Sequence, residues 1–379
     1  MHRFSRRWLL VAASTVGLIG LGAADHVLPA GAAGSTDAAA LRAWILAGAR
    51  SYVGYAESSG RLGLPELPQL ESTTALFTGT TRIRAFVDGP DRFRVDELTP
   101  VGERDTYRID GREYVWDFGF DQLTRVVDAR SARPPARLPR AADLLPPELA
   151  RRLLALAPDD PVTPLPARRI AGRIAAGLRL VPTDPATTVG RVDVWADPAT
   201  GLPLRVEIGA RGEPAAAVAL LATELRAVAE RSPDPTELVP TVPPGAGFVT
   251  AGAADVNGAL RVLDAPPPPR QLAGRDRMPP AGAADANLAG VGLYGAGLAA
   301  FALIPVSRGI AERVIDGSTA AGGVPVEVPS GRAVRLATPL LSVVVRVGNR
   351  GGGALLVGTM TPEVLERAAA DLAQARRRP

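Results

Sequence analysis

The feature that most constrains the fold of this chain is a pair of alternating segments within residues 190–209. In both segments apolar residues occupy every second position, and charged residues such as Asp193 and Glu207 stand between them. A period of two places the apolar side chains on one face of a strand and the charged side chains on the other. The segments therefore predict a β-hairpin in an antiparallel sheet that has one buried face and one face in water. The predicted buried positions are Val192, Val194, Leu204, Val206 and Ile208.

A similar alternation recurs between residues 81 and 128, where short turns separate the segments. The strongest turn signal is Asp110-Gly111, a dipeptide that favours two-residue hairpins. Strands joined by such short turns form an antiparallel meander, because a parallel sheet needs long crossovers. Residues 169–180 are predicted to form one further strand, and residues 213–228 either a strand or a short helix. The predicted buried positions on the first strands of the meander are Ile83, Val87, Phe93 and Val95.

Two amphipathic helices are predicted to cover this sheet. The first begins after Asp37, which is a suitable N-cap residue, and has apolar residues at helical spacing. The second begins at a pair of prolines, which the first turn of a helix tolerates. Its apolar stripe is predicted to contain Leu149, Leu153 and Leu156. Helices and an antiparallel sheet together place the chain in the α+β class.

A change in composition divides the chain. Residues 251–285 are rich in Pro, Gly and Ala and are predicted to link a sheet domain at 36–250 to a smaller α+β domain at 286–379. Residues 286–307 carry no charge, so a transmembrane helix is one alternative there. Several glycines within that stretch disfavour a helix in water, and a β-hairpin is the preferred prediction.

Residues 1–32 have the layout of a secretory signal peptide. Arg3, Arg6 and Arg7 precede an apolar run, and Ala30-Gly31-Ala32 provides a small-residue cleavage site. The protein is therefore predicted to act outside the cytoplasm, either secreted or anchored to the cell membrane by this segment. The paired arginines leave both Sec and Tat export open.

The composition excludes several kinds of catalysis. Cysteine is absent, all 43 basic residues are arginine, and His2 and His26 both precede the predicted cleavage site. A mature chain without these side chains has no Ser-His-Asp triad, no cysteine nucleophile and no zinc site. We predict a protein that is not an enzyme and uses no metal or cofactor, with a carboxylate-based envelope hydrolase as an alternative. The acidic pairs available to such a hydrolase are predicted to be solvated surface charges, namely Asp96-Glu97, Asp159-Asp160 and Asp193 with Asp197.

Motifs in both domains resemble known families. The first domain resembles the LolA-like lipoprotein-carrier superfamily in its N-terminal helix, its meander and the hairpin motif Val-Asp-Val-Trp-x-Asp-Pro-x-Thr-Gly-Leu-Pro-Leu-Arg-Val-Glu at residues 192–207. The C-terminal domain resembles the second domain of RseB/MucB-type sigma-E regulatory proteins at residues 294–298 and 355–363. Together the two resemblances cover residues 37–375.

The resemblance implies a half-barrel sheet closed by helices over an apolar cavity. It also implies either an acyl-chain ligand, as in the carriers, or a membrane anti-sigma factor as partner, as in the regulators. The cavity is predicted to be lined by the nine strand positions given above together with Leu149 and Leu153; the alternative is that they form an ordinary core. We therefore predict a lipid-binding regulator, with a lipid or lipoprotein carrier as the alternative. A net charge of +4 over 379 residues predicts no nucleic-acid partner.

Overall fold

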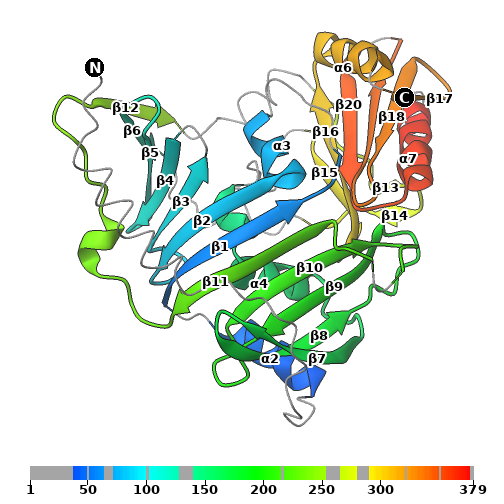
Figure 1. Cartoon of the computed structure of the whole chain (residues 1–379). Coiled ribbons are helices and arrows are strands. Elements are labelled where there is room, and N and C mark those ends of the chain that lie inside the picture. The colour runs from blue at the N-terminus through cyan, green and yellow to red at the C-terminus, as the bar shows by residue number, and fades with distance from the viewer. Residues whose placement is uncertain are drawn as a thin grey trace.

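The computed structural model describes residues 37–48, 51–63, 71–99, 102–127, 140–214, 217–252, 265–279, 290–320, 322–349 and 351–375. These residues form a large curved sheet and a smaller sheet, each with helices packed on it (Figure 1). The predicted signal segment lies outside the described residues. Within the described part of the chain, no helix combines the length and the apolar character that crossing a membrane requires.

The large sheet contains twelve strands. They are β1 (Tyr52–Gly60), β2 (Thr80–Val87), β3 (Phe93–Thr99), β4 (Gly102–Ile109), β5 (Arg112–Asp117), β6 (Gln122–Val127), β7 (Val162–Ile170), β8 (Arg173–Leu180), β9 (Val189–Ala196), β10 (Pro203–Ala210), β11 (Leu221–Ala229) and β12 (Gly247–Gly252). Their order across the sheet is β12-β6-β5-β4-β3-β2-β1-β11-β10-β9-β8-β7. Neighbouring strands are antiparallel, except that β12 runs parallel to β6. The predicted α+β class and antiparallel meander are confirmed.

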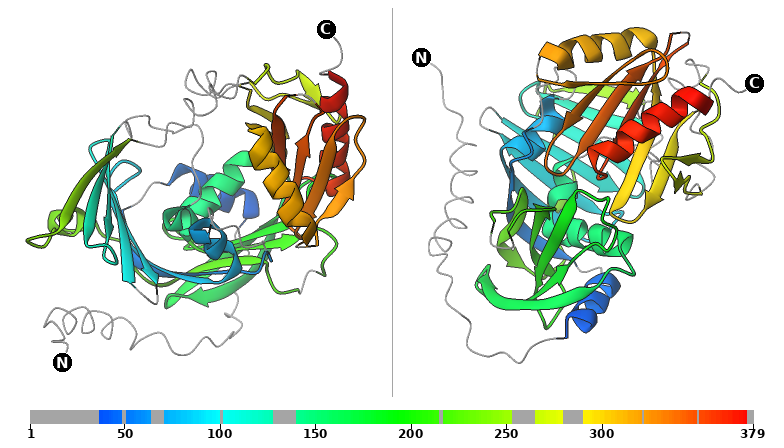
Figure 2. Two further views of the ribbon diagram at one scale, coloured as in Figure 1. Left: turned by 90° about the horizontal axis from the view of Figure 1, so that it is seen from above. Right: turned by 90° about the vertical axis from the view of Figure 1, so that its right-hand side faces the viewer.

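The large sheet curves around a concave side that holds helices (Figure 2). The helices there are α2 (Ala38–Ala47) and α4 (Pro146–Leu156), with the short 3₁₀ helix η1 (Ala141–Leu144) leading into α4. A further helix, α3 (Glu71–Thr78), packs beside β1 and β2, and the 3₁₀ helix η2 (Pro235–Leu238) lies near β3. We call the concave side of the sheet its inner face and the other side its outer face.

The smaller sheet contains six antiparallel strands in the order β15-β16-β20-β19-β18-β17. Their bounds are β15 (Gly292–Ala296), β16 (Ala299–Val306), β17 (Val324–Val326), β18 (Arg332–Ala337), β19 (Ser342–Val347) and β20 (Gly353–Gly358). Two helices, α6 (Arg308–Ala320) and α7 (Pro362–Ala375), cover its two faces. The hairpin predicted within residues 286–307 is confirmed as β15 and β16. A two-stranded ribbon, β13 (Gln271–Leu272) and β14 (Arg275–Asp276), packs against α7.

Three local predictions differ from the structure. Residues 169–180 are not one strand, because Ala171 and Gly172 both adopt positive φ and turn the chain between β7 and β8. Alanine rarely adopts that conformation, so the sequence gives little warning of the turn. Helix α3 was not predicted at all, and Leu156 of the predicted apolar stripe is half exposed because Leu154 faces the sheet instead.

The two domains meet at the loop between β8 and β9. Thr187 Oγ1 donates a hydrogen bond to the carbonyl of Leu298 (2.6 Å), and Thr188 Oγ1 donates one to the carbonyl of Leu340 (2.7 Å). The side chains of Leu298 and Leu340 belong to the core of the large domain, although both residues lie in the smaller one. The smaller domain therefore contributes apolar side chains to the interior of the large domain.

Candidate functional site

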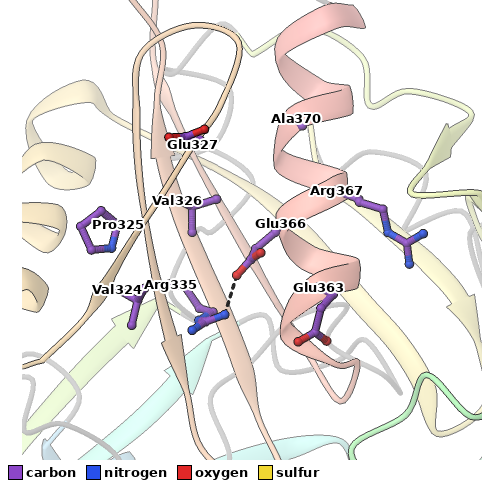
Figure 3. Close-up of a pocket in the computed structure, with 9 residues that line it drawn as sticks. All are labelled: Val324, Pro325, Val326, Glu327, Arg335, Glu363, Glu366, Arg367 and Ala370. Carbon is purple, nitrogen blue, oxygen red and sulfur yellow. Dashed lines mark hydrogen bonds and ion pairs between the residues drawn. The ribbon is translucent and has the colours of Figure 1, made fainter.

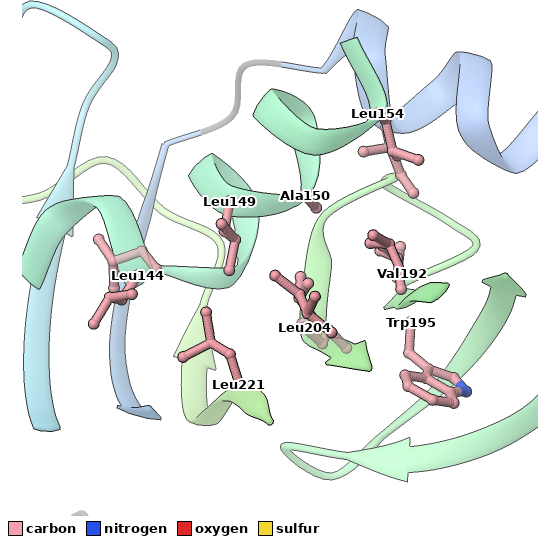
Figure 4. Packing of buried hydrophobic residues seen from close by; sticks show 14 of the residues in the cluster. Leu144, Leu149, Ala150, Leu154, Val192, Trp195, Leu204 and Leu221 are labelled. Carbon is pink, nitrogen blue, oxygen red and sulfur yellow. The ribbon is translucent and has the colours of Figure 1, made fainter. Parts of the chain in front are cut away.

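The predicted cavity residues come together on the inner face of the large sheet. All eleven belong to one apolar cluster or pack against it. Leu204, Val206 and Ile83 are completely buried, whereas Phe93 and Leu153 lie at the edge of the cluster and are only partly buried. Helix α4 provides Leu149 and Leu154 to this cluster from above the strands (Figure 4). The alternation in the sequence therefore identified residues that share one buried surface.

Several members of this cluster were not predicted as site residues. They lie on the neighbouring strands β1, β8 and β11 or on the helices that cover the sheet, and they include Leu41, Ile45, Tyr52, Leu144, Leu154, Leu178, Leu221 and Leu225. The helical spacing of Leu41 and Ile45 is a usable signal, but β11 is rich in alanine and its alternation is weak. Trp195 is buried and belongs to the same apolar cluster, but its side chain lies on the side of β9 opposite Val192, as predicted (Figure 4). Its ring lies 3.9 Å from the guanidinium of Arg168, and its Nε1 donates to the carbonyl of Pro166 at 3.1 Å.

Helix α4 is held over the sheet by polar contacts as well as by leucines. Thr223 on β11 donates from Oγ1 to the carbonyl of Leu144 at 2.6 Å, just before the helix begins. Arg42 on α2 donates to the carbonyls of Leu154 (3.0 Å) and Ala157 at the other end. A cation at a helix C-terminus is favourable, because the free carbonyls there have partial negative charge. The two ends of the helix are therefore fixed by different elements.

One hydrogen bond joins the inner face of the sheet to the first turn of α4. The hydroxyl of Tyr52 donates to Oε2 of Glu148 at 3.0 Å. Burial raises the pKa of Tyr52 well above its usual value, and burial also raises the pKa of Glu148. Glu148 is thus a carboxyl group beside the apolar cluster, held by the hydroxyl of Tyr52.

The outer face of the large sheet holds a network of arginines and carboxylates. Opposite charges stand directly across neighbouring strands, as in the pairs Arg84–Asp96, Arg179–Asp193 and Arg205–Glu224. Asp96 and Asp193 are buried by these partners and by the strands beside them, and Asp197 is buried beside Arg173. The prediction of solvated surface charges is therefore wrong for these three acids, whereas Asp159 is exposed as predicted. Long arginine side chains lie over the sheet and exclude water from the carboxylates.

At one place in this network three carboxylates converge. Oxygen atoms of Asp96, Glu103 and Asp105 lie within 4.8 Å of one another. Arg94 donates to Asp96 (2.6 Å) and to Asp105 (3.1 Å), and Nε of Arg84 lies 3.2 Å from the other oxygen of Asp96. Burial raises the pKa of Asp105 to about 9, with the neighbouring Asp96 carboxylate adding to the rise. When Asp105 binds a proton, two ionised carboxylates remain beside two guanidiniums, and the net charge of the cluster becomes zero.

This acidic cluster does not suit a metal ion or a hydrolase. Two guanidiniums already contact the carboxylates and would repel a cation placed between them. Asp96 and Asp105 have 0% and 1% of their surface exposed, so a polymeric substrate has no route to their oxygens. The chemistry that fits the cluster is a buried, shared proton rather than a bound ion.

A surface groove of about 520 Å³ lies in the smaller domain between β17, β18 and α7 (Figure 3). Arg335 and Glu366 form an ion pair of 2.7 Å within it. A backbone hydrogen bond at the start of α7 and the hydroxyl of Thr361 lower the pKa of Glu363. An acid that stays ionised at neutral pH is a poor proton donor, so Glu363 does not suit the role of a general acid.

Several solved structures of known proteins are similar to this chain. No family model matches the chain, and no curated protein sequence matches it. A crystal structure of MucB is 16% identical, with 88% of this chain and 96% of that chain covered and a TM-score of 0.45. The MucA/MucB complex of Pseudomonas aeruginosa is 17% identical over 87% of this chain and 94% of that chain, also with a TM-score of 0.45. A LolA-superfamily protein from Nitrosomonas europaea is 11% identical over 54% of this chain and 98% of that chain, with a TM-score of 0.23.

Both the MucB-type proteins and the LolA superfamily, which the sequence resembles in its two domains, are represented among the solved structures similar to this chain.

Proposed function

We propose that this is an exported protein that binds the acyl chain of a lipid or of a lipidated partner on the inner face of its large sheet, and that it regulates a membrane anti-sigma factor. The observation that supports binding is the continuous apolar cluster between the strands and only a few helices. Most of its residues lie on a curved sheet, which gives the surface the length and concavity that an acyl chain needs.

Binding requires α4 to move, because the chain's own leucines cover the strands in the present arrangement. Leu149 and Leu154 are the large α4 side chains that an acyl chain would replace. Burying each of them stabilises the fold by roughly 1.5–3 kcal/mol. A ligand with a long acyl chain gains about 0.8 kcal/mol for each buried methylene group, so a chain of ordinary lipid length offsets this cost.

The test of lipid binding is extraction and displacement. Protein purified from the envelope is extracted with organic solvent, and the extract is analysed by mass spectrometry; we expect a co-purifying lipid. In solution, a fluorescent long-chain fatty acid should bind to the purified protein. Val206→Trp, which fills the inner face, should weaken binding roughly tenfold, and Leu149→Ala, which loosens α4, should not weaken it.

The matched control is Arg82→Gln on the outer face, which should bind the fatty acid as the unsubstituted chain does. Two results together contradict binding on the inner face: the purified protein contains no lipid, and its affinity for the fatty acid is the same in all three variants. Melting curves for each variant separate lost binding from lost folding.

The proposed partner follows from the two-domain layout, since a carrier needs only the first domain. In the structures of MucB with MucA, the partner is the periplasmic part of MucA, and this is the kind of partner to test. We expect the extracytoplasmic segment of a membrane anti-sigma factor to be retained by the immobilised chain and released by lipid. If the segment is not retained and the chain transfers lipid between vesicles, it is a carrier. Turnover of cell-wall glycan by the purified chain would instead identify a hydrolase.

A further inference from the structure

The two sheets have four edges, and three of them are protected against pairing with another strand. On β7, Pro164 and Pro166 remove backbone donors, and two arginines follow them. On β15, the backbone N–H of Met278 donates to the carbonyl of Leu293 at 2.7 Å, so residues 277–278 cover this edge. The remaining edge of the smaller sheet, β17, is only three residues long and contains Pro325. These are the devices by which sheet proteins avoid association.

In the part of the chain that the structure describes, the fourth edge, β12, has none of these devices. Its six residues, Gly-Phe-Val-Thr-Ala-Gly, include no proline and no charge. Among the described residues, β6 is its partner on one side and no strand pairs with the other. It lies at the end of the large sheet remote from the smaller domain (Figure 1). An uncharged edge of this length offers a row of backbone donors and acceptors to another strand.

Exposed aromatic side chains gather beside this edge. Phe118, Phe120 and Phe248 have 49%, 81% and 60% of their surface exposed. The backbone N–H of Gly247 donates to the carbonyl of Asp121 at 2.9 Å, which holds the turn between β5 and β6 against the start of β12. Phe248 stands next to Leu123 in register, so it lies on the outer face with the cluster of Tyr107 and Trp116. Three exposed phenylalanines around one open edge are unusual for a surface that faces water alone.

We propose that β12 pairs with β12 of a second copy of this chain, antiparallel and about a two-fold axis perpendicular to the sheet. Such an axis keeps the outer face of one copy continuous with the outer face of the other, so each residue meets a residue of the same face. Centred on Val249, the pairing places Phe248 of one copy opposite Thr250 of the other. The partner strand that suits this edge has no charge to leave unpaired and no proline to interrupt the pairing. The β12 strand of a second copy meets both conditions. The aromatic side chains of both copies then shield the new pair from water.

The absence of cysteine from the chain makes the test direct, because each variant has a single thiol. Single cysteines are placed at Phe248, Val249 and Thr250, with Arg169→Cys on the protected β7 edge as the control. Under a mild oxidant, the cysteine at the two-fold axis should form a disulfide-linked dimer at least roughly tenfold faster than the control, because only there do the two Cα atoms approach closely enough. A rate at all three positions that is no higher than at Arg169→Cys overturns the proposal.

Sedimentation of the purified chain provides the second measurement. We expect a monomer–dimer equilibrium, and Val249→Lys should weaken it roughly tenfold or more by placing like charges across the axis. A chain that remains monomeric at high concentration, or a dimer that Val249→Lys leaves unchanged, also overturns the proposal. Melting curves verify that the substituted chain still folds.

Discussion

The inner and outer faces of the large sheet are built from the same strands and both contain fully buried side chains, but for different reasons. On the inner face, apolar side chains such as Leu204 and Val206 are covered by helices. On the outer face, Asp193 is 2% exposed although no helix of the described residues lies over β9 there; Arg179 and Arg191 cover it. A face of alternating charges is therefore not necessarily a solvated one. When opposite charges stand across neighbouring strands, long arginine side chains take the place of a covering layer.

The two faces should respond differently to substitution. The inner face depends on packed volume, so its losses should scale with the atoms removed. The outer face depends on charge balance, so its losses should depend on whether a buried charge is left alone.

The largest effect is expected from Arg94→Met on the outer face. Arg94 contacts Asp96, Asp105 and Glu103, and its loss leaves Arg84 as the one guanidinium beside two ionised carboxylates, Asp96 and Glu103. We expect the free energy of unfolding to fall by about 3–5 kcal/mol, measured by urea denaturation at neutral pH. The control is Arg94→Met combined with Asp96→Asn, which removes a charge of each sign and should lose less than Arg94→Met alone. A loss no larger than that of an exposed pair would show that the network is solvated.

A somewhat smaller effect is expected from Leu204→Ala on the inner face. Leu204 is completely buried, so the substitution removes apolar contacts and leaves a cavity. We expect a loss of about 3 kcal/mol in the same urea experiment. The volume-conserving Leu204→Met should lose less than about 1.5 kcal/mol. Equal losses for the two variants would contradict a face that depends on packed volume.

A pH-dependent effect is expected from the acidic cluster. The pKa of Asp105 is about 9 in the folded chain and near 4 when unfolded, so between these pH values the folded state holds a proton that the unfolded state has lost. Stability should therefore fall as pH rises across this range, by at most about 1.4 kcal/mol per pH unit.

Asp105→Asn removes this proton and should flatten the decline. The measurement is urea denaturation of both proteins at several pH values from mildly acidic to mildly alkaline. Parallel curves would show that Asp105 does not bind the proton. The sign distinguishes this acid from an ordinary paired carboxylate, whose contribution is lost as pH falls.

The smallest effect is expected from Arg82→Gln, also on the outer face. The Arg82 side chain is 64% exposed and lies 3.8 Å from Glu57. Exposed ion pairs contribute little, and we expect a change in the free energy of unfolding of at most about 0.5 kcal/mol. A loss comparable to that of Arg94→Met would mean that burial does not determine how much each outer-face arginine contributes to the free energy of unfolding.

The sequence by itself determined the class of the fold and most of its strands. Alternation at Ile83 and Val87, and again at Val192 and Val206, identified one face of an antiparallel sheet, because a side-chain period of two is a local property of a strand. The same local reasoning found α4 from its prolines and leucines, and it found the hairpin of β15 and β16 from its glycines.

The tertiary structure alone decided what covers each face. The burial of Asp96 and Asp105 depends on which strands become neighbours and in what register, and a single sequence does not specify either. The same is true of β12, which adds to β6 in parallel after a long separation in sequence and leaves an open edge. The contribution of Leu298 and Leu340 to the large core likewise follows from the docking of two domains. These features arise from contacts between distant segments, whose free energy no local pattern records.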